Sequence, residues 1–254
     1  MRLSAWCLVL GAWCVVAGCG KPKVERVEWP VMGTVAAVQT RGATAEETAE
    51  AVRAAKAEFA RIEKLLNAHD PNSELSRLAP LPEAEILKRC DKDVRECYEM
   101  AFDLMRKSGG AFNPRWRGTN TLDLGAIAKG FAVDLAATRV PTGDYDVLLD
   151  LGGNLRAVRG DWKLGIAGSG ESLELEENQS CATSAEYYRG KHIYDGRTGN
   201  VVTNDLLSVT IVHPSSAMLA DGLSTICFIL GETEGEAFLK KFYPEARAIW
   251  IRKE

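Results

Sequence analysis

The sequence predicts an α+β fold, a class in which helices and strands are interleaved irregularly along the chain. Apolar residues recur at helical spacing in two long segments, near residues 45–66 and 91–107. Between residues 145 and 212, short β-type runs are separated by glycine-rich turns such as Gly152-Gly153-Asn154. Because no regular strand-helix alternation is present, these runs favour α+β over a doubly wound parallel sheet.

Composition excludes several classes of protein. The chain has 254 residues, of which 46% are hydrophobic and 26% charged, which is typical of a globular protein. A net charge of −4, from 31 Lys and Arg against 35 Asp and Glu, gives no electrostatic footprint for nucleic acid. Seven cysteines are too few for a disulfide scaffold. We therefore expect a core of apolar packing and no nucleic-acid partner.

Residues 1–18 are predicted to be an exported lipoprotein signal. The uncharged run 3–18 would reach about 24 Å as a helix, short of the hydrocarbon core of about 30 Å, so a cleaved signal is favoured over an uncleaved anchor. Val16-Ala17-Gly18-Cys19 matches a bacterial lipobox, in which the thiol of Cys19 is acylated. We expect a chain lipid-anchored to a bacterial membrane, with residues 19–30 as a lipidated polar tether and 31–254 as one domain.

The first half of that domain is predicted to open on a strand and continue as two helices. The strand starts at Met32-Gly33-Thr34 and runs to Gln39. Thr44 and Glu47 form a capping-box pattern, which predicts a long helix ending near Asn67. The second helix is expected from about Asp91 to Lys107 and is stopped by Gly109-Gly110.

The second half is predicted to be rich in strands. Residues 122–125 read as a strand and turn, and residues 126–138 read as a helix. Strands are expected at 145–151, 155–158, 162–167, 206–212 and 246–251, and helices at 217–230 and 232–243. Cys90 and Cys97 are expected to be unpaired. Cys181 and Cys227 are favoured as small core residues, with a disulfide between them left open.

A turn rich in small residues, Gly125-Ala126-Ile127-Ala128-Lys129-Gly130, stands where a strand is expected to pass into a helix. Such a turn exposes backbone N–H groups to an anion, and Lys129 would add a positive charge. A tight helix-sheet contact explains the glycines equally well. Asp123, two residues earlier, is a candidate to accept a hydrogen bond from a ribose or a ring N–H, or to cap the helix.

A second candidate is Ala220-Asp221-Gly222-Leu223-Ser224-Thr225. Asp221 and Thr225 are four residues apart, so they share one helical face and offer a carboxylate and a hydroxyl. Oxygen ligands of this kind suit Mg²⁺. On this pattern alone, we favour the alternative that Asp221 only complements the dipole at the N-terminus of a helix.

Three histidines are present, and only one is a candidate for proton transfer. His192 lies in a polar turn among charged residues, where it could act as a general base or be an exposed loop residue. His69 is placed in a loop, and His213 precedes a proline at a strand end and looks structural. No serine-hydrolase elbow or zinc-protease motif is present in the sequence.

Taken in order, these segments resemble the ApbE family of FAD:protein FMN transferases, which are periplasmic and often lipid-anchored. The motifs that carry the resemblance are Met32-Gly33-Thr34, 70–77, Gly109-Gly110-Ala111-Phe112-Asn113-Pro114, 122–130, Asp150-Leu151-Gly152-Gly153-Asn154, Ala182-Thr183-Ser184, 192–199 and 220–225.

The resemblance implies a mixed sheet-and-helix fold with the flavin site between two packed lobes. It also implies that, with Mg²⁺ bound, FMN passes from FAD to a threonine hydroxyl of an exported redox protein and AMP is released. The residues matching the flavin contacts are Met32, His69, Ala111, Phe112, Asn113, Asp123, Lys129 and Ile193. Those matching the metal site are the Ala126 carbonyl, Asp221, Ser224 and Thr225, and the residues matching catalytic groups are His192, Asp221 and Lys129.

The chain departs from the family pattern at several points. His69 stands where the family usually has an aromatic residue, Asn113 replaces an aspartate, and only a short loop separates Pro114 from Thr121. Ala185 and Gly196 replace a glycine and a proline. Two other functions therefore stay open, a non-catalytic FAD-binding lipoprotein and an FAD pyrophosphatase that produces FMN and AMP.

Overall fold

The computed structural model describes residues 22–166, 170–185 and 193–253, and it confirms the α+β class. Seven strands form one antiparallel sheet in the order β1-β2-β3-β4-β7-β8-β9, while β5 and β6 form a separate hairpin. The strands are β1 Val24–Val31, β2 Thr34–Arg41, β3 Asp146–Leu151, β4 Asn154–Arg159, β5 Trp162–Gly165, β6 Ser172–Leu175, β7 Ser180–Ala185, β8 Leu206–His213 and β9 Arg247–Arg252. The helices are α1 Ala45–Leu66, α2 Glu74–Leu78, α3 Glu83–Arg89, α4 Lys92–Lys107, α5 Gly125–Ala137 and α6 Ala217–Phe242.

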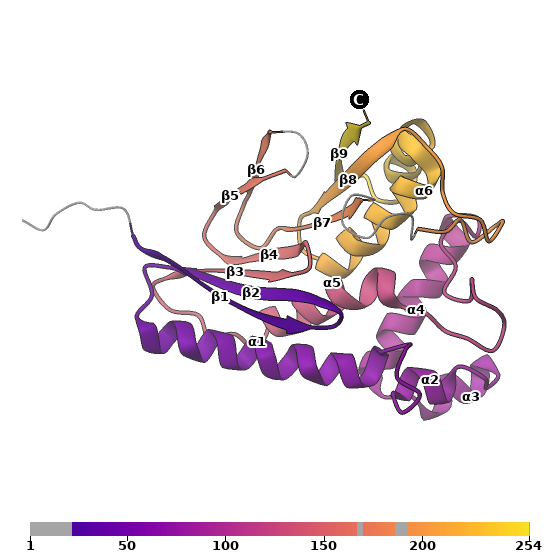
Figure 1. The fold of residues 1–254 in the computed structure, drawn as a ribbon, viewed down its shortest axis with the longest axis horizontal. Coiled ribbons are helices and arrows are strands. Elements are labelled where there is room, and N and C mark those ends of the chain that lie inside the picture. The colour runs from indigo at the N-terminus through magenta and orange to yellow at the C-terminus, as the bar shows by residue number, and fades with distance from the viewer. Residues whose placement is uncertain (1–21, 167–169, 186–192, 254) are drawn as a thin grey trace, which may run out of the picture.

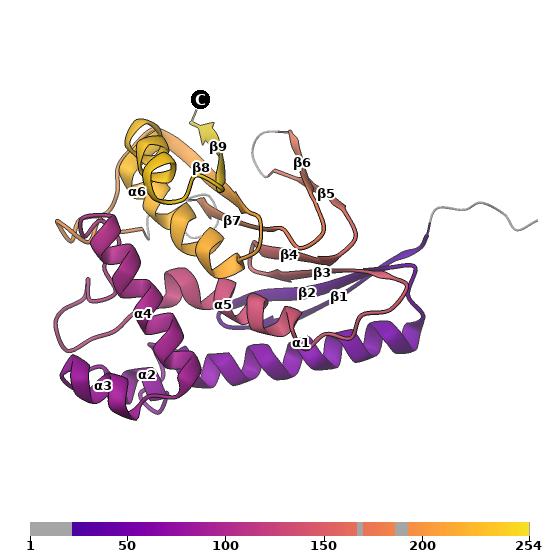
Figure 2. The same cartoon turned by 180° about the vertical axis from the view of Figure 1, so that it is seen from behind.

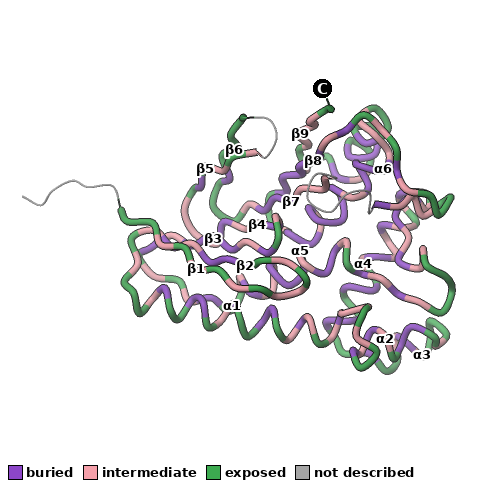
Figure 3. Tube along the Cα trace, in the orientation of Figure 1, coloured by how far each residue is buried: buried purple, intermediate pink, exposed green. Residues whose placement is uncertain are grey.

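The two faces of the sheet are covered differently. Helices α1, α5 and α6 lie on one face, and the β5-β6 hairpin bends over the other (Figures 1 and 2). Successive side chains of a strand point to opposite faces, so Leu149 of β3 joins the helix-side core while Leu148 packs with Trp162 of the hairpin. Figure 3 shows the buried stripe of α1 turned toward the sheet and its exposed residues turned away.

The prediction of a tether up to residue 30 is wrong for its second half, because residues 24–31 form the edge strand β1. Val24–Val31 pairs antiparallel with β2 from Val24 opposite Arg41 to Val31 opposite Thr34. Val27, Trp29 and Val31 pack against the core, and the intervening residues are exposed. The alternation of these apolar residues with exposed ones has the period of two that is typical of a strand with one buried face, so the sequence does carry a signal for β1.

Residues 1–21, which include the predicted signal and the predicted lipidation site Cys19, lie outside the described residues. In the part of the chain that the structure describes, no helix combines the length and the apolar character needed to cross a bilayer.

Several predicted strands and helices differ from those in the structure. The strand expected at 122–125 is wrong, because residues 121–124 are irregular and α5 already begins at Gly125. The strand expected at 162–167 ends at Gly165. Helices α2 and α3 and strands β6 and β7 were not predicted, although β7 is an inner strand that joins β4 to β8.

The long helices follow their local signals. Thr44 and Glu47 form the predicted capping box at the start of α1, which contributes about 1 kcal/mol to helix stability. Asp91 caps α4. The two helices predicted at 217–230 and 232–243 are confirmed as the halves of α6, which is interrupted at Gly231 by a positive φ of 76°.

The start of α6 is held by two buried or half-buried side chains. The carboxylate of Asp134 accepts hydrogen bonds from the backbone N–H groups of Ala217 and Met218, at 2.8 and 3.0 Å, and it pairs with Arg156. His213 Nδ1 accepts from the backbone N–H groups of residues 215 and 216. Burial lowers the pKa of His213, so the neutral ring that can accept these bonds is favoured.

The four described cysteines are free and buried, which confirms Cys90 and Cys97 as unpaired and Cys181 and Cys227 as core residues. Cys181 and Cys227 are therefore not joined. Burial raises the pKa of both thiols, so they stay protonated at neutral pH.

Candidate functional site

The candidate site is built where α5 packs directly against α6. Gly130 of α5 faces the backbone of α6 so closely that a Cβ atom there would lie 2.1 Å from the Ala217 carbonyl oxygen. Gly222 of α6 is also enclosed, because a Cβ would lie 2.6 Å from Leu104 of α4 and 2.9 Å from Ile127 of α5. The glycines therefore serve a tight contact, and that contact is between two helices rather than between a helix and the sheet.

This contact brings the two sequence candidates together. Asp221 of α6 is 5% exposed, and its Oδ2 lies 3.3 Å from Lys129 Nζ. The same oxygen accepts a hydrogen bond of 3.1 Å from the Gly130 N–H. Lys129 also donates to the Gly125 carbonyl at 3.1 Å. Burial and the charge of Asp221 both raise the pKa of the Cys97 thiol on α4, which keeps that neighbour neutral.

Three hydroxyl groups lie next to Asp221. Ser224 and Thr225 donate to the Asp221 carbonyl oxygen at 2.8 and 3.3 Å, and the hydroxyl of Ser184 on β7 lies 2.8 Å from Ser224 Oγ and 3.3 Å from Thr225 Oγ1. Thr225 thus shares the α6 face of Asp221, as the four-residue spacing predicted. We name Lys129, Asp221, Ser184, Ser224 and Thr225 the α5/α6 polar group.

The donor atoms of this group suit a hard cation. Each hydroxyl oxygen keeps a lone pair after its present hydrogen bonds, because a hydroxyl offers one donor and two acceptor sites. The buried Asp221 carboxylate and the nearby hydroxyls of Ser224 and Thr225 are oxygen donors, which is the chemistry Mg²⁺ prefers, and the Ala126 carbonyl that the resemblance adds lies in the first turn of α5. Within the described residues, no cluster of three or more His, Cys, Asp or Glu side chains suits a softer metal.

The predicted flavin contacts at 111–113 lie beside residues 193–199, a segment that begins with the predicted contact Ile193. The Gly196 N–H donates to the Ala111 carbonyl at 2.9 Å, and the Asn113 amide reaches the Gly196 carbonyl at 3.5 Å. Ala111, Phe112 and Ile193 are buried. A Cβ at Gly196 would lie 2.4 Å from the Cβ of Asn113, so glycine at 196 permits this close approach.

Asp123 both caps α5 and binds an aromatic residue. Its Oδ1 accepts from the Gly125 N–H at 3.0 Å, as the capping interpretation expected. Its Oδ2 accepts from the Trp116 indole N–H at 3.2 Å and lies 3.6 Å from the Arg117 guanidinium. The short loop after Pro114 is thus in direct contact with a predicted ligand-binding carboxylate.

Two further predicted contacts lie around the C-terminal part of α1. The Met32 N–H donates to Glu63 Oε1 at 2.9 Å, with Met32 at a positive φ of 51°, and the His69 N–H donates to Asn67 Oδ1. Neither is hydrogen-bonded to the α5/α6 polar group within the described residues. His192, the predicted general base, lies outside the described residues.

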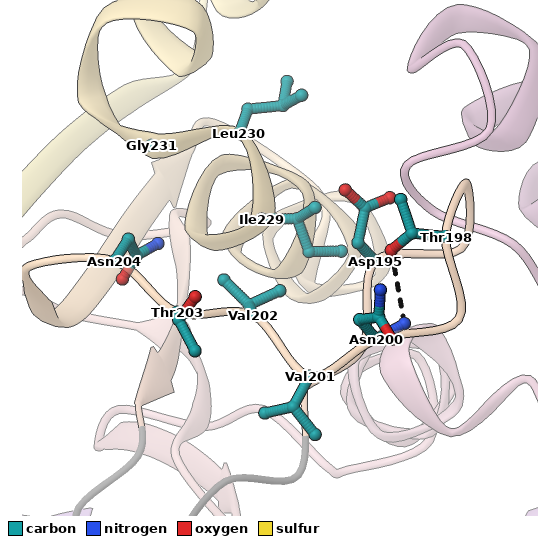
Figure 4. Close-up of a pocket in the computed structure, with 10 residues that line it drawn as sticks. All are labelled: Asp195, Thr198, Asn200, Val201, Val202, Thr203, Asn204, Ile229, Leu230 and Gly231. Carbon is teal, nitrogen blue, oxygen red and sulfur yellow. Dashed lines mark hydrogen bonds between the residues drawn. The ribbon is translucent and has the colours of Figure 1, made fainter.

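A separate open pocket of about 300 Å³ lies between residues 195–204 and the break in α6 at Gly231 (Figure 4). Its walls combine Ile229 and Val202 with the polar groups of Thr198 and Asn200, whose N–H donates to Thr198 Oγ1 at 3.2 Å. Its lining does not include any member of the α5/α6 polar group, and we place the candidate site at that group because the convergent charges are there.

The residues alone did not single out Ser184, the Gly130 N–H or Trp116. Ser184 lies on the unpredicted strand β7, and only its place in the Ala182-Thr183-Ser184 motif pointed to it. The role of Gly130 could be found only from the helix contact. Trp116 lies in the short loop, where the only signal was an aromatic residue between two arginines.

Comparison with known proteins gives a consistent result. The ApbE family model matches residues 32–120 and 115–250. The chain is 35% identical over 158 residues to a FAD:protein FMN transferase of Treponema pallidum, covering 51% of this chain and 43% of that protein. It is 36% identical over 147 residues to one of Klebsiella pneumoniae, covering 52% of this chain and 46% of that protein. The chain thus spans less than half of the length of these relatives.

Solved structures share the fold. The flavin transferase ApbE from Vibrio cholerae superposes with a TM-score of 0.75 at 21% identity, over 92% of this chain and 94% of that one. The apo form of the flavinyl transferase ApbE from Pseudomonas stutzeri gives 0.75 at 22% identity, over 93% of each chain. With the family model matching most of residues 32–250, the chain belongs to the ApbE family.

Proposed function

We propose that this protein transfers FMN from FAD to a threonine hydroxyl of an acceptor protein and releases AMP, with Mg²⁺ bound at the α5/α6 polar group. The names of the relatives support the reaction class. The observation that carries the proposal is the buried Asp221 carboxylate, which contacts the Lys129 ammonium group and the Gly130 N–H, while the Ser224 and Thr225 hydroxyls bind the backbone carbonyl of the same residue. Such a group can bind the charged oxygens of a phosphate ester together with a cation.

The chain's own residues have distinct tasks in this reaction. Asp221, Ser224, Thr225 and the Ala126 carbonyl would hold Mg²⁺, which when bound neutralises charge on phosphoryl oxygens. Lys129 adds a positive charge, and its ammonium group contacts the Asp221 carboxylate and the Gly125 carbonyl. Release of Lys129 from that pair would let it face the phosphoryl oxygens.

The transfer exchanges one phosphorus-oxygen bond for another. The threonine oxygen of the acceptor forms a bond to the FMN phosphorus, and the bond from that phosphorus to the AMP oxygen breaks. The hydroxyl proton passes to a base, for which we propose His192, and AMP leaves with the bridging oxygen. Because a threonine hydroxyl is a weak nucleophile at neutral pH, the reaction needs both the base and charge neutralisation.

We also propose the setting of the reaction. Acylation of Cys19 would anchor the protein to a bacterial membrane facing the periplasm, where the acceptors would be exported redox proteins. β1 begins at Val24, so only a few residues would separate the acyl chains from the folded domain. The folded domain would therefore be held close to the membrane surface.

The test uses the detergent-solubilised full chain with FAD, Mg²⁺ and a peptide that carries an Asp-Gly-Ala-Thr sequence. We expect a fluorescent covalent peptide adduct and equimolar AMP. Asp221→Ala should abolish both products, whereas Asp144→Ala, at a fully exposed carboxylate, should leave both unchanged. AMP without adduct would indicate a pyrophosphatase, and FAD retained without AMP would indicate a binding protein.

A further inference from the structure

The short loop between Pro114 and Thr121 holds an aromatic stack. The rings of Trp116 and Tyr194 lie with centroids 4.4 Å apart and an angle of 16° between their planes. The Arg117 guanidinium lies over the Trp116 ring, with its Cζ 4.7 Å from the ring centroid. Trp116 and Tyr194 are half-buried, so part of the stack meets solvent. The indole therefore contacts a second ring and a planar cation at once.

The orientation of Trp116 is fixed by two independent sets of bonds. Its indole N–H donates to Asp123 Oδ2 at 3.2 Å, and its backbone N–H donates to the Asn113 carbonyl at 3.2 Å. Arg115 donates to the Ala79 and Thr121 carbonyl oxygens at 3.1 and 3.2 Å, which ties the loop to α2 and to its own end. The ring is thus held in place before any ligand arrives, which reduces the entropy cost of binding.

The other residue in contact with the ring is easily displaced. The Arg117 side chain is 42% exposed, and its ion pair with Asp123 is long at 3.6 Å. Exposed pairs of this kind, and exposed cation-π contacts, contribute little stability. Stacking of a nucleobase on an aromatic residue is stronger than either. A planar heteroaromatic ring can therefore replace the guanidinium on the Trp116 surface.

We propose that Trp116 is a stacking surface for a planar heteroaromatic ring of the dinucleotide substrate, and that the Arg117 guanidinium covers this surface in the free protein. The proposal rests on the proposed function in one respect, that the substrate is FAD. The ring is either the flavin or the adenine. In both cases Trp116 is a positioning residue for the substrate and Asp123 fixes the indole.

Two uncharged probes distinguish the rings. Riboflavin carries the flavin ring and adenosine carries the adenine ring, and neither has a phosphate, so the charge of the site contributes little to their binding. We would measure riboflavin affinity from the quenching of its fluorescence and adenosine affinity by calorimetry, with the full chain. Trp116→Leu should weaken binding of one probe about tenfold. Trp116→Phe should restore much of it, because the phenyl ring still stacks but cannot donate to Asp123.

A matched control exists on β9. Trp250 also donates its indole N–H to a carboxylate, Glu236 Oε1, and it lies on β9 at the edge of the seven-stranded sheet. Trp250→Phe should leave the affinity of both probes unchanged. Equal losses in Trp250→Phe and Trp116→Phe, or no loss for either probe in Trp116→Leu, would overturn the proposal. If Trp116→Leu does not fold, the Trp116→Phe and Arg117→Ala proteins still decide the outcome.

Arg117→Ala tests whether the Arg117 guanidinium covers the Trp116 ring in the free protein. If the guanidinium competes for the ring surface, its removal should tighten binding of the preferred probe about twofold to fivefold. Weaker binding of that probe by Arg117→Ala would contradict this role of Arg117. Probe binding needs no turnover, so the result is independent of the proposed transfer. If the protein binds riboflavin through Trp116 but forms no adduct, only the proposed transfer is contradicted. If it forms adduct and Trp116→Leu leaves the affinity for both probes unchanged, only the stacking role of Trp116 is contradicted.

Discussion

Replacing Gly130 with alanine would place a methyl group against the backbone of α6. The new Cβ would lie 2.1 Å from the Ala217 carbonyl oxygen and 2.8 Å from the Met218 Cα, whereas ordinary contacts begin near 3.4 Å. The helices would have to separate by about 1 Å, because backbone atoms cannot rotate away as a side chain does. Overpacking of this kind costs about 1–3 kcal/mol of unfolding free energy.

The same separation disturbs the site. The Gly130 N–H that donates to Asp221 moves with α5, so the bond of 3.1 Å lengthens and the carboxylate loses a fixed donor. We therefore expect Gly130→Ala to lower both the unfolding free energy, measured by urea denaturation, and the rate of AMP release from FAD. The stability loss should be within the range of about 1–3 kcal/mol.

Gly165 provides the control, because a Cβ there meets open space. Gly165→Ala in β5 should change the unfolding free energy by less than about 0.5 kcal/mol and leave AMP release unchanged. A Gly130→Ala protein as stable and active as Gly165→Ala would refute the tight contact between α5 and α6 and its role in placing Asp221.

Three further predictions concern single side chains. Asp134→Ala removes the carboxylate that accepts hydrogen bonds from backbone N–H groups at the start of α6, and urea denaturation should show that the free energy of unfolding falls by about 1–3 kcal/mol. A loss no larger than that of the control Asp144→Ala would contradict the capping role of Asp134. The pKa of His213 is lowered by burial, so the folded state binds fewer protons than the unfolded state and stability should fall as the pH drops below about 6.5; His213→Asn should flatten this decline, and an unchanged slope would count against it. Ser184→Ala removes the hydroxyl that contacts Ser224, and we expect it to raise the Mg²⁺ concentration for half-maximal AMP release about tenfold. An unchanged Mg²⁺ requirement would contradict a role for Ser184 in positioning Ser224.

Local signals predicted the helices better than the sheet. The capping box at Thr44 and Glu47 acts within one turn, so it can be read from neighbouring residues, and α1 begins where it predicts. β7 consists of small residues from Ser180 to Ala185, and among them only Thr183 is of a type enriched in strands. It is an inner strand only because β4 and β8 pair with it on both sides, and that pairing depends on residues far apart in the chain.

The same distinction applies to the site. The spacing of Asp221 and Thr225 predicted a shared helical face, and both now lie beside Ser224. The pairing of Asp221 with Lys129 requires α5 to pack against α6, which no local pattern specifies. Trp116 was missed because its partners, Asp123 and Tyr194, are brought to it by the loop geometry.

The stoichiometry of products in a single reaction of the full chain with FAD, Mg²⁺ and the threonine peptide decides whether the protein is an FMN transferase. Mass spectrometry would count peptide that has gained FMN, and chromatography would count AMP. We expect one AMP for each modified peptide in the unaltered protein and neither product in Asp221→Ala. AMP formed without modified peptide, or modified peptide formed equally well by Asp221→Ala, would contradict the proposed function.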